Sequence, residues 1–171
     1  MKQVLIFALC TILALSCCAC GQDIGIIGSA EFAHAAQSRI RELKKAGYNA
    51  VRSAHNPMSP ALLDACDKLG MYVMDEFADA WVTAKVDFDY GTEMPTWWKQ
   101  DIHAMVEKDY NHPCVILYSI GNEISEAGNP IDIQWGKLLA DEIRKLDDTR
   151  YVTNCINPLL CAMDQFVALM K

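Results

Sequence analysis

The stretch that most constrains the fold is residues 114–123, Cys-Val-Ile-Leu-Tyr-Ser-Ile-Gly-Asn-Glu. It is an apolar run rich in β-branched and aromatic residues, and it stops at Gly-Asn-Glu. A strand of a parallel sheet is covered on both faces and loses polar alternation, so the run predicts a fully buried strand. Such a strand delivers Glu123 to its C-terminal end. Glu123 is therefore the candidate catalytic residue, and the alternative is a solvated loop carboxylate.

Helix and strand patterns alternate along the rest of the chain. Apolar residues at helical spacing, with helix-start and helix-end signals, predict helices at 36–46, 59–70, 95–110 and 130–146, and another near Leu159. Short apolar runs predict strands at 48–52, 71–74 and 151–154 beside the one above. Residues 81–94 are predicted to be a functional loop. The predicted inward stripe of the fourth helix is Ile131, Trp135, Leu138, Leu139 and Ile143.

This alternation predicts an α/β fold with right-handed crossovers and a parallel sheet. Either an open doubly wound sheet or a (β/α)8 barrel fits the pattern. The strand ends favour the barrel, because barrel enzymes build their sites from polar residues that converge from several strand ends. Those residues are Arg52 and His55, Asp75 and Glu76, Asn122 and Glu123, and Asn154.

Composition and charge narrow the class of protein. With 52% apolar and 22% charged residues, the chain can bury a sizeable core and is not a disordered chain. Its net charge is −7 and it has no cluster of Lys and Arg. Electrostatic binding to nucleic acid or to an anionic membrane needs such a cluster, so no nucleic-acid partner is expected.

Residues 1–20 are predicted to be a leader. The apolar run at 4–15 follows Lys2 and is too short to span a bilayer, which is typical of a secretory signal peptide. Residues 16–21, Ser-Cys-Cys-Ala-Cys-Gly, resemble the cleavage site of bacterial lipoproteins. We therefore expect an exported protein, periplasmic or anchored to the membrane through a lipidated Cys. The alternative is a buried N-terminal strand or helix.

Four more cysteines lie in the body of the chain, at Cys66, Cys114, Cys155 and Cys161. Their spacing matches no zinc pattern, and single Cys residues in apolar surroundings are commonly small buried hydrophobes. The alternative is that two of them form a disulfide in an oxidising compartment.

Four motifs, in order, resemble the catalytic barrel of glycoside hydrolase family two, which contains β-galactosidases, β-glucuronidases and β-mannosidases. They are Gly-Tyr-Asn-Ala-Val-Arg-Ser-Ala-His-Asn-Pro at 47–57, Asp-Lys-Leu-Gly-Met-Tyr-Val-Met-Asp-Glu at 67–76, Asn-His-Pro-Cys-Val-Ile at 111–116 and Ser-Ile-Gly-Asn-Glu at 119–123. Any one alone is a weak signal, and the ordered set is a strong one. The resemblance covers the chain from about Asp23 to its end.

The resemblance implies a retaining hydrolase of terminal β-linked sugars, most similar to a β-galactosidase, with no cofactor. Glu123 would be the general acid/base, and a second carboxylate would lie about 5–5.5 Å away as the nucleophile. Asn122 would bond the 2-hydroxyl of the sugar. Arg52 and His55 would line the subsite of the cleaved sugar, with Asp75 and Glu76 at its floor or wall.

Each of these assignments has a structural alternative. Arg52 could bridge buried carboxylates such as Glu76, and that role would still order the site. His55 could be a turn or capping residue before Asn-Pro. Asp75 and Glu76 are more readily structural than substrate-binding.

The tryptophans are candidates of another kind. Trp81, Trp97 and Trp98 could stack on sugar rings, although the helical spacing of Trp98 favours the core.

The chain also departs from the family pattern. Residues 21–171 are expected to form the N-terminal half of a barrel, through the fifth strand, because a complete barrel needs about 250 residues. The family nucleophile lies on a later strand, and no Glu follows Glu142. Residues 77–81 do not match the family's acidic-His metal pattern, so no metal is expected. The alternative function is a non-catalytic exported lipoprotein or carbohydrate-binding remnant.

Overall fold

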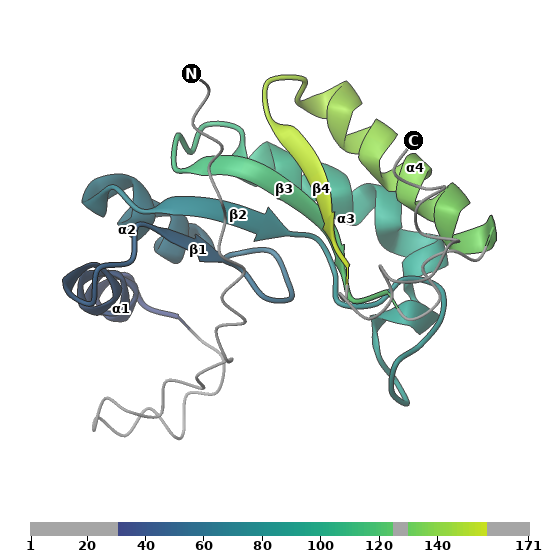
Figure 1. Cartoon of the computed structure of the whole chain (residues 1–171), viewed down its shortest axis with the longest axis horizontal. Helices are drawn as coiled ribbons and strands as arrows, with labels where there is room; N and C mark the ends of the chain where they lie inside the picture. The colour runs from purple at the N-terminus through teal and green to yellow at the C-terminus, as the bar shows by residue number, and fades with distance from the viewer. Residues whose placement is uncertain (1–30, 125–129, 157–171) are drawn as a thin grey trace, which may run out of the picture. The chain divides into compact units, whose positions relative to one another are not determined.

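The computed structural model describes residues 31–124 and 130–156 (Figure 1). The predicted leader at 1–20, the predicted helix near Leu159 and Cys161 lie outside the described residues. In the part that is described, none of the helices is long and apolar enough to cross a membrane.

The core of the structure is a four-stranded parallel sheet in the order β1-β2-β3-β4 (Figure 1). Each strand pairs with the next along the chain, and a helix makes each crossover, as the alternating pattern predicted. The strands are β1 (Ala50–Arg52), β2 (Tyr72–Glu76), β3 (Val115–Asn122) and β4 (Tyr151–Cys155). The predicted strands are confirmed, and β2 and β3 extend into the polar residues that were expected to follow them.

Four α-helices and one 3-10 turn complete the described fold. They are α1 (Ala33–Lys45), α2 (Pro60–Leu69), η1 (Tyr90–Thr92), α3 (Met94–Asp109) and α4 (Pro130–Leu146). The signals at the ends of α2 act as expected: Ser59 Oγ accepts the backbone N–H of Leu62 at 3.2 Å, and Gly70 takes the left-handed conformation with φ 69°. Local chemistry therefore explains where this helix begins and ends.

The helices pack in pairs, α1 on α2 and α3 on α4 (Figure 1). Leu139 and Ile143 of α4 are fully buried, as predicted. Two residues of the predicted stripe are not buried, because Ile131 is 54% exposed and Leu138 is 42% exposed. They lie on the flank of the helix, about a quarter turn from the line through Leu139 and Ile143 that contacts the core.

Trp98 of α3 is partly buried and packs edge-on against Trp135 of α4. The two ring centroids are 5.9 Å apart, an arrangement that aromatic pairs favour. The expectation that Trp98 belongs to the core is confirmed.

Alternation along the strands places different side chains on the two faces of the sheet. Asp75 faces α3, since Lys108 Nζ of that helix lies 3.2 Å from its Oδ2. Glu76, the next residue, points to the other face and accepts a hydrogen bond from Ser119 Oγ of the paired strand at 2.7 Å. The polar site therefore forms on the face of the sheet opposite α3.

Candidate active site

The centre of the site is the carboxylate of Glu76, at the C-terminal end of β2. Its side chain is fully buried. Arg52, at the end of β1, donates to both of its oxygens, from Nε at 2.9 Å and from Nη2 at 3.0 Å. A bidentate pair of this kind fixes direction as well as charge. The predicted bridge between Arg52 and Glu76 is confirmed.

His55 completes this cluster from the loop after β1. Its Nδ1 lies 2.7 Å from Glu76 Oε1 and 3.2 Å from Arg52 Nη2. The side chain is 37% exposed, so the imidazole lies where a ligand can reach it. The structure thus brings two predicted subsite residues, Arg52 and His55, onto one buried carboxylate.

The side-chain amide of Asn122, at the end of β3, is held at both ends. Its Oδ1 accepts from Arg52 Nη2 at 2.5 Å, and its Nδ2 donates to Asp79 Oδ1 at 2.9 Å. Because a guanidinium only donates and a carboxylate only accepts, these two partners determine which way the amide is turned. Asn122 therefore presents a fixed orientation beside Glu123.

Glu123 follows β3 directly and is exposed. Its backbone has φ 42°, in the left-handed region that few non-glycine residues occupy. The N–H of Glu123 donates to the carbonyl oxygen of Cys155 at 2.7 Å. The strand predicted to carry this carboxylate to the end of the sheet is present.

The charges at the site reinforce one another. Burial by itself lowers the pKa of Arg52, but the hydrogen bond and the charge of Glu76 outweigh it and raise this pKa above its ordinary value. For Asp79, burial acts to raise the pKa, and hydrogen bonds from Lys85 and Asn122 bring it below the ordinary value. Arg52 therefore stays cationic and Asp79 stays anionic near neutral pH.

Asp75 is the predicted site residue that the structure does not bring into this cluster. It is fully buried on the opposite face of the sheet from Glu76. Its carboxylate accepts the backbone N–H of Met58 at 2.8 Å and a bond from the Ser53 hydroxyl. Asp75 thus ties β2 to the loop that carries His55, which is the structural role rather than the subsite wall.

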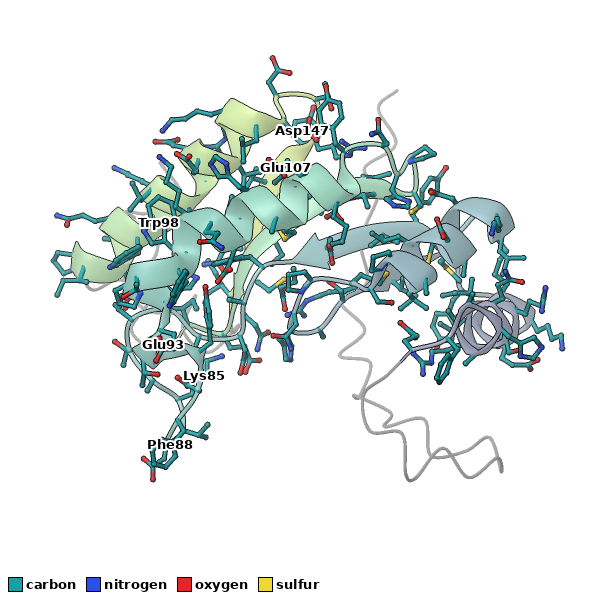
Figure 2. The ribbon with its side chains drawn as sticks, turned by 180° about the vertical axis from the view of Figure 1, so that it is seen from behind. Lys85, Phe88, Glu93, Trp98, Glu107 and Asp147 are labelled. Carbon is teal, nitrogen blue, oxygen red and sulfur yellow. The ribbon has the colours of Figure 1, made fainter. Side chains whose placement is uncertain are left out.

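Sequence reasoning missed two residues of the site, Asp79 and Lys85. Lys85 Nζ lies 2.7 Å from Asp79 Oδ1 and 2.6 Å from the carbonyl oxygen of Asn122. Figure 2 shows Lys85 near the base of the loop that follows β2, with Phe88 at its tip. The loop was predicted to be functional, but nothing in its local pattern distinguishes Lys85 from a solvated lysine.

Trp81 is not available for stacking on a sugar. It is 3% exposed, and its indole Nε1 donates to the carbonyl oxygen of Ile120 at 2.8 Å. A Cβ on Gly121 would lie 2.7 Å from Trp81 Nε1, and one on Gly136 would lie 3.1 Å from its ring. Trp81 therefore fills the space between β3 and α4, where the two glycines leave room for it.

One group of metal-type donors lies elsewhere, at Asp67, His112 and Cys114, with ligand atoms within 4.8 Å of one another. These groups already bond one another, because Asp67 accepts the backbone N–H of Cys114 at 2.8 Å and lies 2.6 Å from His112 Nδ1. Burial, with the nearby Asp67 carboxylate, raises the pKa of the Cys114 thiol and keeps it protonated. The arrangement fits a structural hydrogen-bond cluster.

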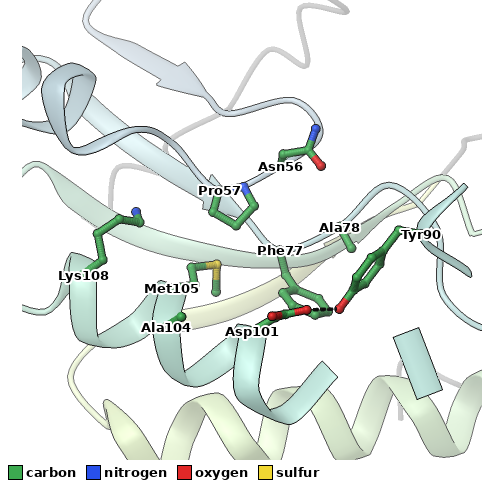
Figure 3. A pocket seen from close by; sticks show the side chains of 9 residues that line it. All are labelled: Asn56, Pro57, Phe77, Ala78, Tyr90, Asp101, Ala104, Met105 and Lys108. Carbon is green, nitrogen blue, oxygen red and sulfur yellow. Dashed lines mark hydrogen bonds between the residues drawn. The ribbon is translucent and has the colours of Figure 1, made fainter. Parts of the chain in front are cut away.

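A cavity of about 370 Å³ lies between the loop after β1 and α3 (Figure 3). Asn56 and Pro57 form one side and Met105 and Lys108 the other, and Tyr90 Oη donates to Asp101 at 2.6 Å within it. None of Arg52, His55, Asn122 and Glu123 lines this cavity. The polar cluster at the strand ends, and not this cavity, is therefore the candidate active site.

The chain is similar to known proteins in sequence and in structure. The β-galactosidase BoGH2A of Bacteroides ovatus is 36% identical over 132 residues, which are 77% of this chain and 15% of that protein. A crystal structure of a glycosyl hydrolase family 2 member from Bacteroides cellulosilyticus superposes with TM-score 0.76 at 43% identity, covering 81% of this chain and 18% of that one. An uncultured Clostridium β-glucuronidase gives TM-score 0.62 at 28% identity, covering 72% and 22%.

These matches confirm the predicted α/β fold as part of a TIM barrel. The chain spans less than a fifth of the length of BoGH2A and of the Bacteroides cellulosilyticus protein. The family model described as "Glycosyl hydrolases family 2, TIM barrel domain" matches residues 32–169. On this match, and on the order of its four motifs along the sheet, the chain belongs to glycosyl hydrolase family 2.

Proposed function

We propose that this chain supplies the acid/base half of a retaining β-glycosidase that cleaves terminal β-linked galactosides. The observation that carries the proposal is the position of Glu123. It follows β3 at the C-terminal ends of the strands, where Arg52, His55, Glu76 and Asn122 gather. The choice of a galactoside is supported by the name of the Bacteroides ovatus relative.

In the first step, Glu123 donates its proton to the glycosidic oxygen as the bond from that oxygen to the anomeric carbon breaks. A second carboxylate, about 5–5.5 Å from Glu123, forms a bond to the anomeric carbon. In the second step, the Glu123 carboxylate takes a proton from water, and the water oxygen displaces the enzyme carboxylate. The products are the free sugar and the released alcohol.

The neighbouring residues would bind and orient the sugar. Asn122 is held by Arg52 and Asp79, and each of its polar atoms has one further hydrogen-bonding position for the 2-hydroxyl. His55 is partly exposed beside Arg52 and would bond another hydroxyl of the same sugar. Both groups are oriented before the substrate arrives, which lowers the entropic cost of binding.

We further propose that activity belongs to a complete barrel and that this chain alone is inactive. The four described strands form an open sheet, whereas the fold closes with eight strands. Export, with anchoring through a lipidated Cys in residues 1–20, stays part of the proposal and is supported only by the leader pattern.

The test uses a chimera in which this chain replaces the matching segment of BoGH2A. Glu123→Gln keeps the shape and removes the acid, so we expect the rate of aryl β-galactoside hydrolysis to fall about 10²–10⁴-fold. Glu107→Gln, an exposed glutamate on α3, is the matched control and should leave the rate unchanged. Hydrolysis unaffected by Glu123→Gln would falsify the assignment. Galactoside binding with no turnover in the parent chimera would support the binding remnant instead.

A further inference from the structure

We infer that Lys85 is a positioning residue for Glu123, acting through the peptide unit between Asn122 and Glu123. The inference rests on the proposed function of Glu123. It concerns a residue in the loop after β2, outside the four motifs that carry the family resemblance.

The first observation is that a single peptide unit is held from both sides. Its carbonyl oxygen, on Asn122, accepts a hydrogen bond from Lys85 Nζ at 2.6 Å. Its N–H, on Glu123, donates to the carbonyl oxygen of Cys155 in β4 at 2.7 Å. Because a peptide unit is planar, bonds at both edges set the tilt of that plane. That tilt determines the direction in which the Glu123 side chain leaves the backbone.

The second observation is the backbone conformation of Glu123. With φ 42° it lies in the left-handed region, where a side chain costs about 1–2 kcal/mol relative to the ordinary conformations. Such a conformation persists when its surroundings hold it. Among the described residues, Lys85 and Cys155 supply hydrogen bonds to this peptide unit.

The third observation is that Lys85 is itself held in place. Asp79 Oδ1 accepts from Lys85 Nζ at 2.7 Å and also from Asn122 Nδ2 at 2.9 Å. The backbone N–H of Lys85 donates to Asp89 Oδ2 at 2.6 Å. The Lys85 side chain is only 21% exposed, so its ammonium is part of the site and not a solvated charge. Asp79 and Lys85 together hold Asn122 by its side chain and by its carbonyl group.

A positioning role has a specific kinetic consequence. If Lys85 is lost, Glu123 is misplaced relative to the glycosidic oxygen, and small misplacements of a catalytic group cost up to about 100-fold in rate. The loss should fall on the step that needs the acid. A basic leaving group depends on protonation, whereas a very acidic phenol leaves without it. The defect should therefore be large for poor leaving groups and small for activated ones.

The kinetic experiment compares Lys85→Met and Lys85→Arg in the BoGH2A chimera. For an alkyl or unsubstituted phenyl β-galactoside, Lys85→Met should lower kcat/KM about 10–100-fold. For a dinitrophenyl β-galactoside, the same variant should lose less than about 3-fold in kcat/KM, because kcat/KM reports the first step and that step then needs little acid assistance. Lys85→Arg, which can still donate to the Asn122 carbonyl oxygen, should recover part of the loss. Lys45→Met, an exposed lysine on α1, is the control.

A second measurement uses the 171-residue chain itself and does not depend on activity. Hydrogen exchange of the Glu123 amide should be faster in Lys85→Met than in the parent chain, while the amides inside α2 stay unchanged. An unchanged Glu123 amide overturns the inference. So does an equal loss of kcat/KM for both kinds of leaving group, since that is the signature of general damage. Chimera activity that survives Glu123→Gln refutes the proposed function instead. The exchange result still shows whether Lys85 holds the peptide unit between Asn122 and Glu123.

Discussion

At the scale of single residues, the site depends on one buried carboxylate, that of Glu76, whose two oxygens are both hydrogen-bonded. Glu76 receives bonds from Arg52, His55 and Ser119. Removing one partner of such a buried pair leaves an uncompensated charge, which costs about 3–5 kcal/mol. The structural role of Arg52 is therefore shown, while its contact with a sugar stays a prediction.

A second buried carboxylate, Asp109, lies on the other face of the sheet. Burial, with the neighbouring Asp75, raises its pKa to about 8, although Lys108 acts in the opposite direction. Tyr118 and Arg150 also lie near enough to interact with its charge. At neutral pH Asp109 is therefore mainly protonated.

The raised pKa of Asp109 predicts that the free energy of unfolding depends on pH, and Asp109→Asn should reduce this dependence. The folded pKa of about 8 is above the unfolded value of about 3.9, so the folded chain holds this proton more tightly. The stabilisation it contributes is complete below about pH 4 and is lost as pH rises toward 8. The side-chain amide that the substitution introduces stays neutral throughout this range. Urea unfolding of the 171-residue chain at a series of pH values measures the difference.

The matched control is Asp64→Asn, at an exposed position on α2. It should keep the pH dependence of the parent chain. Identical pH profiles for the parent chain and for Asp109→Asn, between pH 4 and 8, would show that Asp109 does not hold a proton in the folded state.

At the scale of elements, the end of α2 depends on one glycine. Gly70 has φ 69°, and the nearest atom to an added Cβ is Lys44 Nζ at 3.9 Å. Gly70→Ala would therefore meet no clash, and its cost is the conformation alone. We expect a loss of about 1 kcal/mol in the free energy of unfolding, measured by urea denaturation.

Gly70→Asn provides the comparison for this prediction, because asparagine tolerates the left-handed conformation better than alanine does. It should lose less stability than Gly70→Ala. If the two variants are equally destabilised, backbone conformation is not the cause.

The elements themselves were largely predictable, because their signals are local. Ser59 and Gly70 mark the ends of α2 in the sequence, and the β-branched run marks β3. The side of α4 that is buried was less predictable. Ile131 and Leu138 are apolar but lie beside the packing line, and the position of that line depends on where α3 and the sheet meet the helix.

A site residue could be predicted where its position follows from the local sequence pattern. Arg52, Asn122 and Glu123 stand at strand ends, so the parallel topology was enough to bring them together. Lys85 reaches the site from an irregular loop through contacts with Asp79 and with the backbone of Asn122. Contacts made by an irregular loop produce no repeating pattern of residues in the sequence. Three-dimensional structure is therefore needed to find them.

At the scale of the whole molecule, the sheet that the described residues form has two edges. Within the described residues, β1 and β4 each pair with one neighbouring strand. Unpaired edges of this kind favour association with other chains. We expect the purified 171-residue chain to form oligomers as its concentration rises, as measured by size-exclusion chromatography with light scattering.

Tyr151→Lys tests whether β4 is the edge that associates. Tyr151 is 83% exposed at the start of β4, and lysine on an edge strand opposes pairing. The variant should shift the chain toward monomer. Tyr110→Lys, at a 52% exposed position beyond the end of α3, should not. A parent chain that stays monomeric, or two variants that behave alike, would contradict this expectation.

The hydrogen bond from the Glu123 N–H to the Cys155 carbonyl oxygen also bears on how the protein is made. The motif that contains Glu123 leaves the ribosome before β4 does. At about 5–20 residues per second, the intervening segment takes on the order of seconds to synthesise. A nascent chain halted before Cys155 would carry the entire Gly-Asn-Glu motif without the contact that aligns it. Translation therefore sets the earliest moment at which Glu123 can take the backbone orientation that it has in the structure.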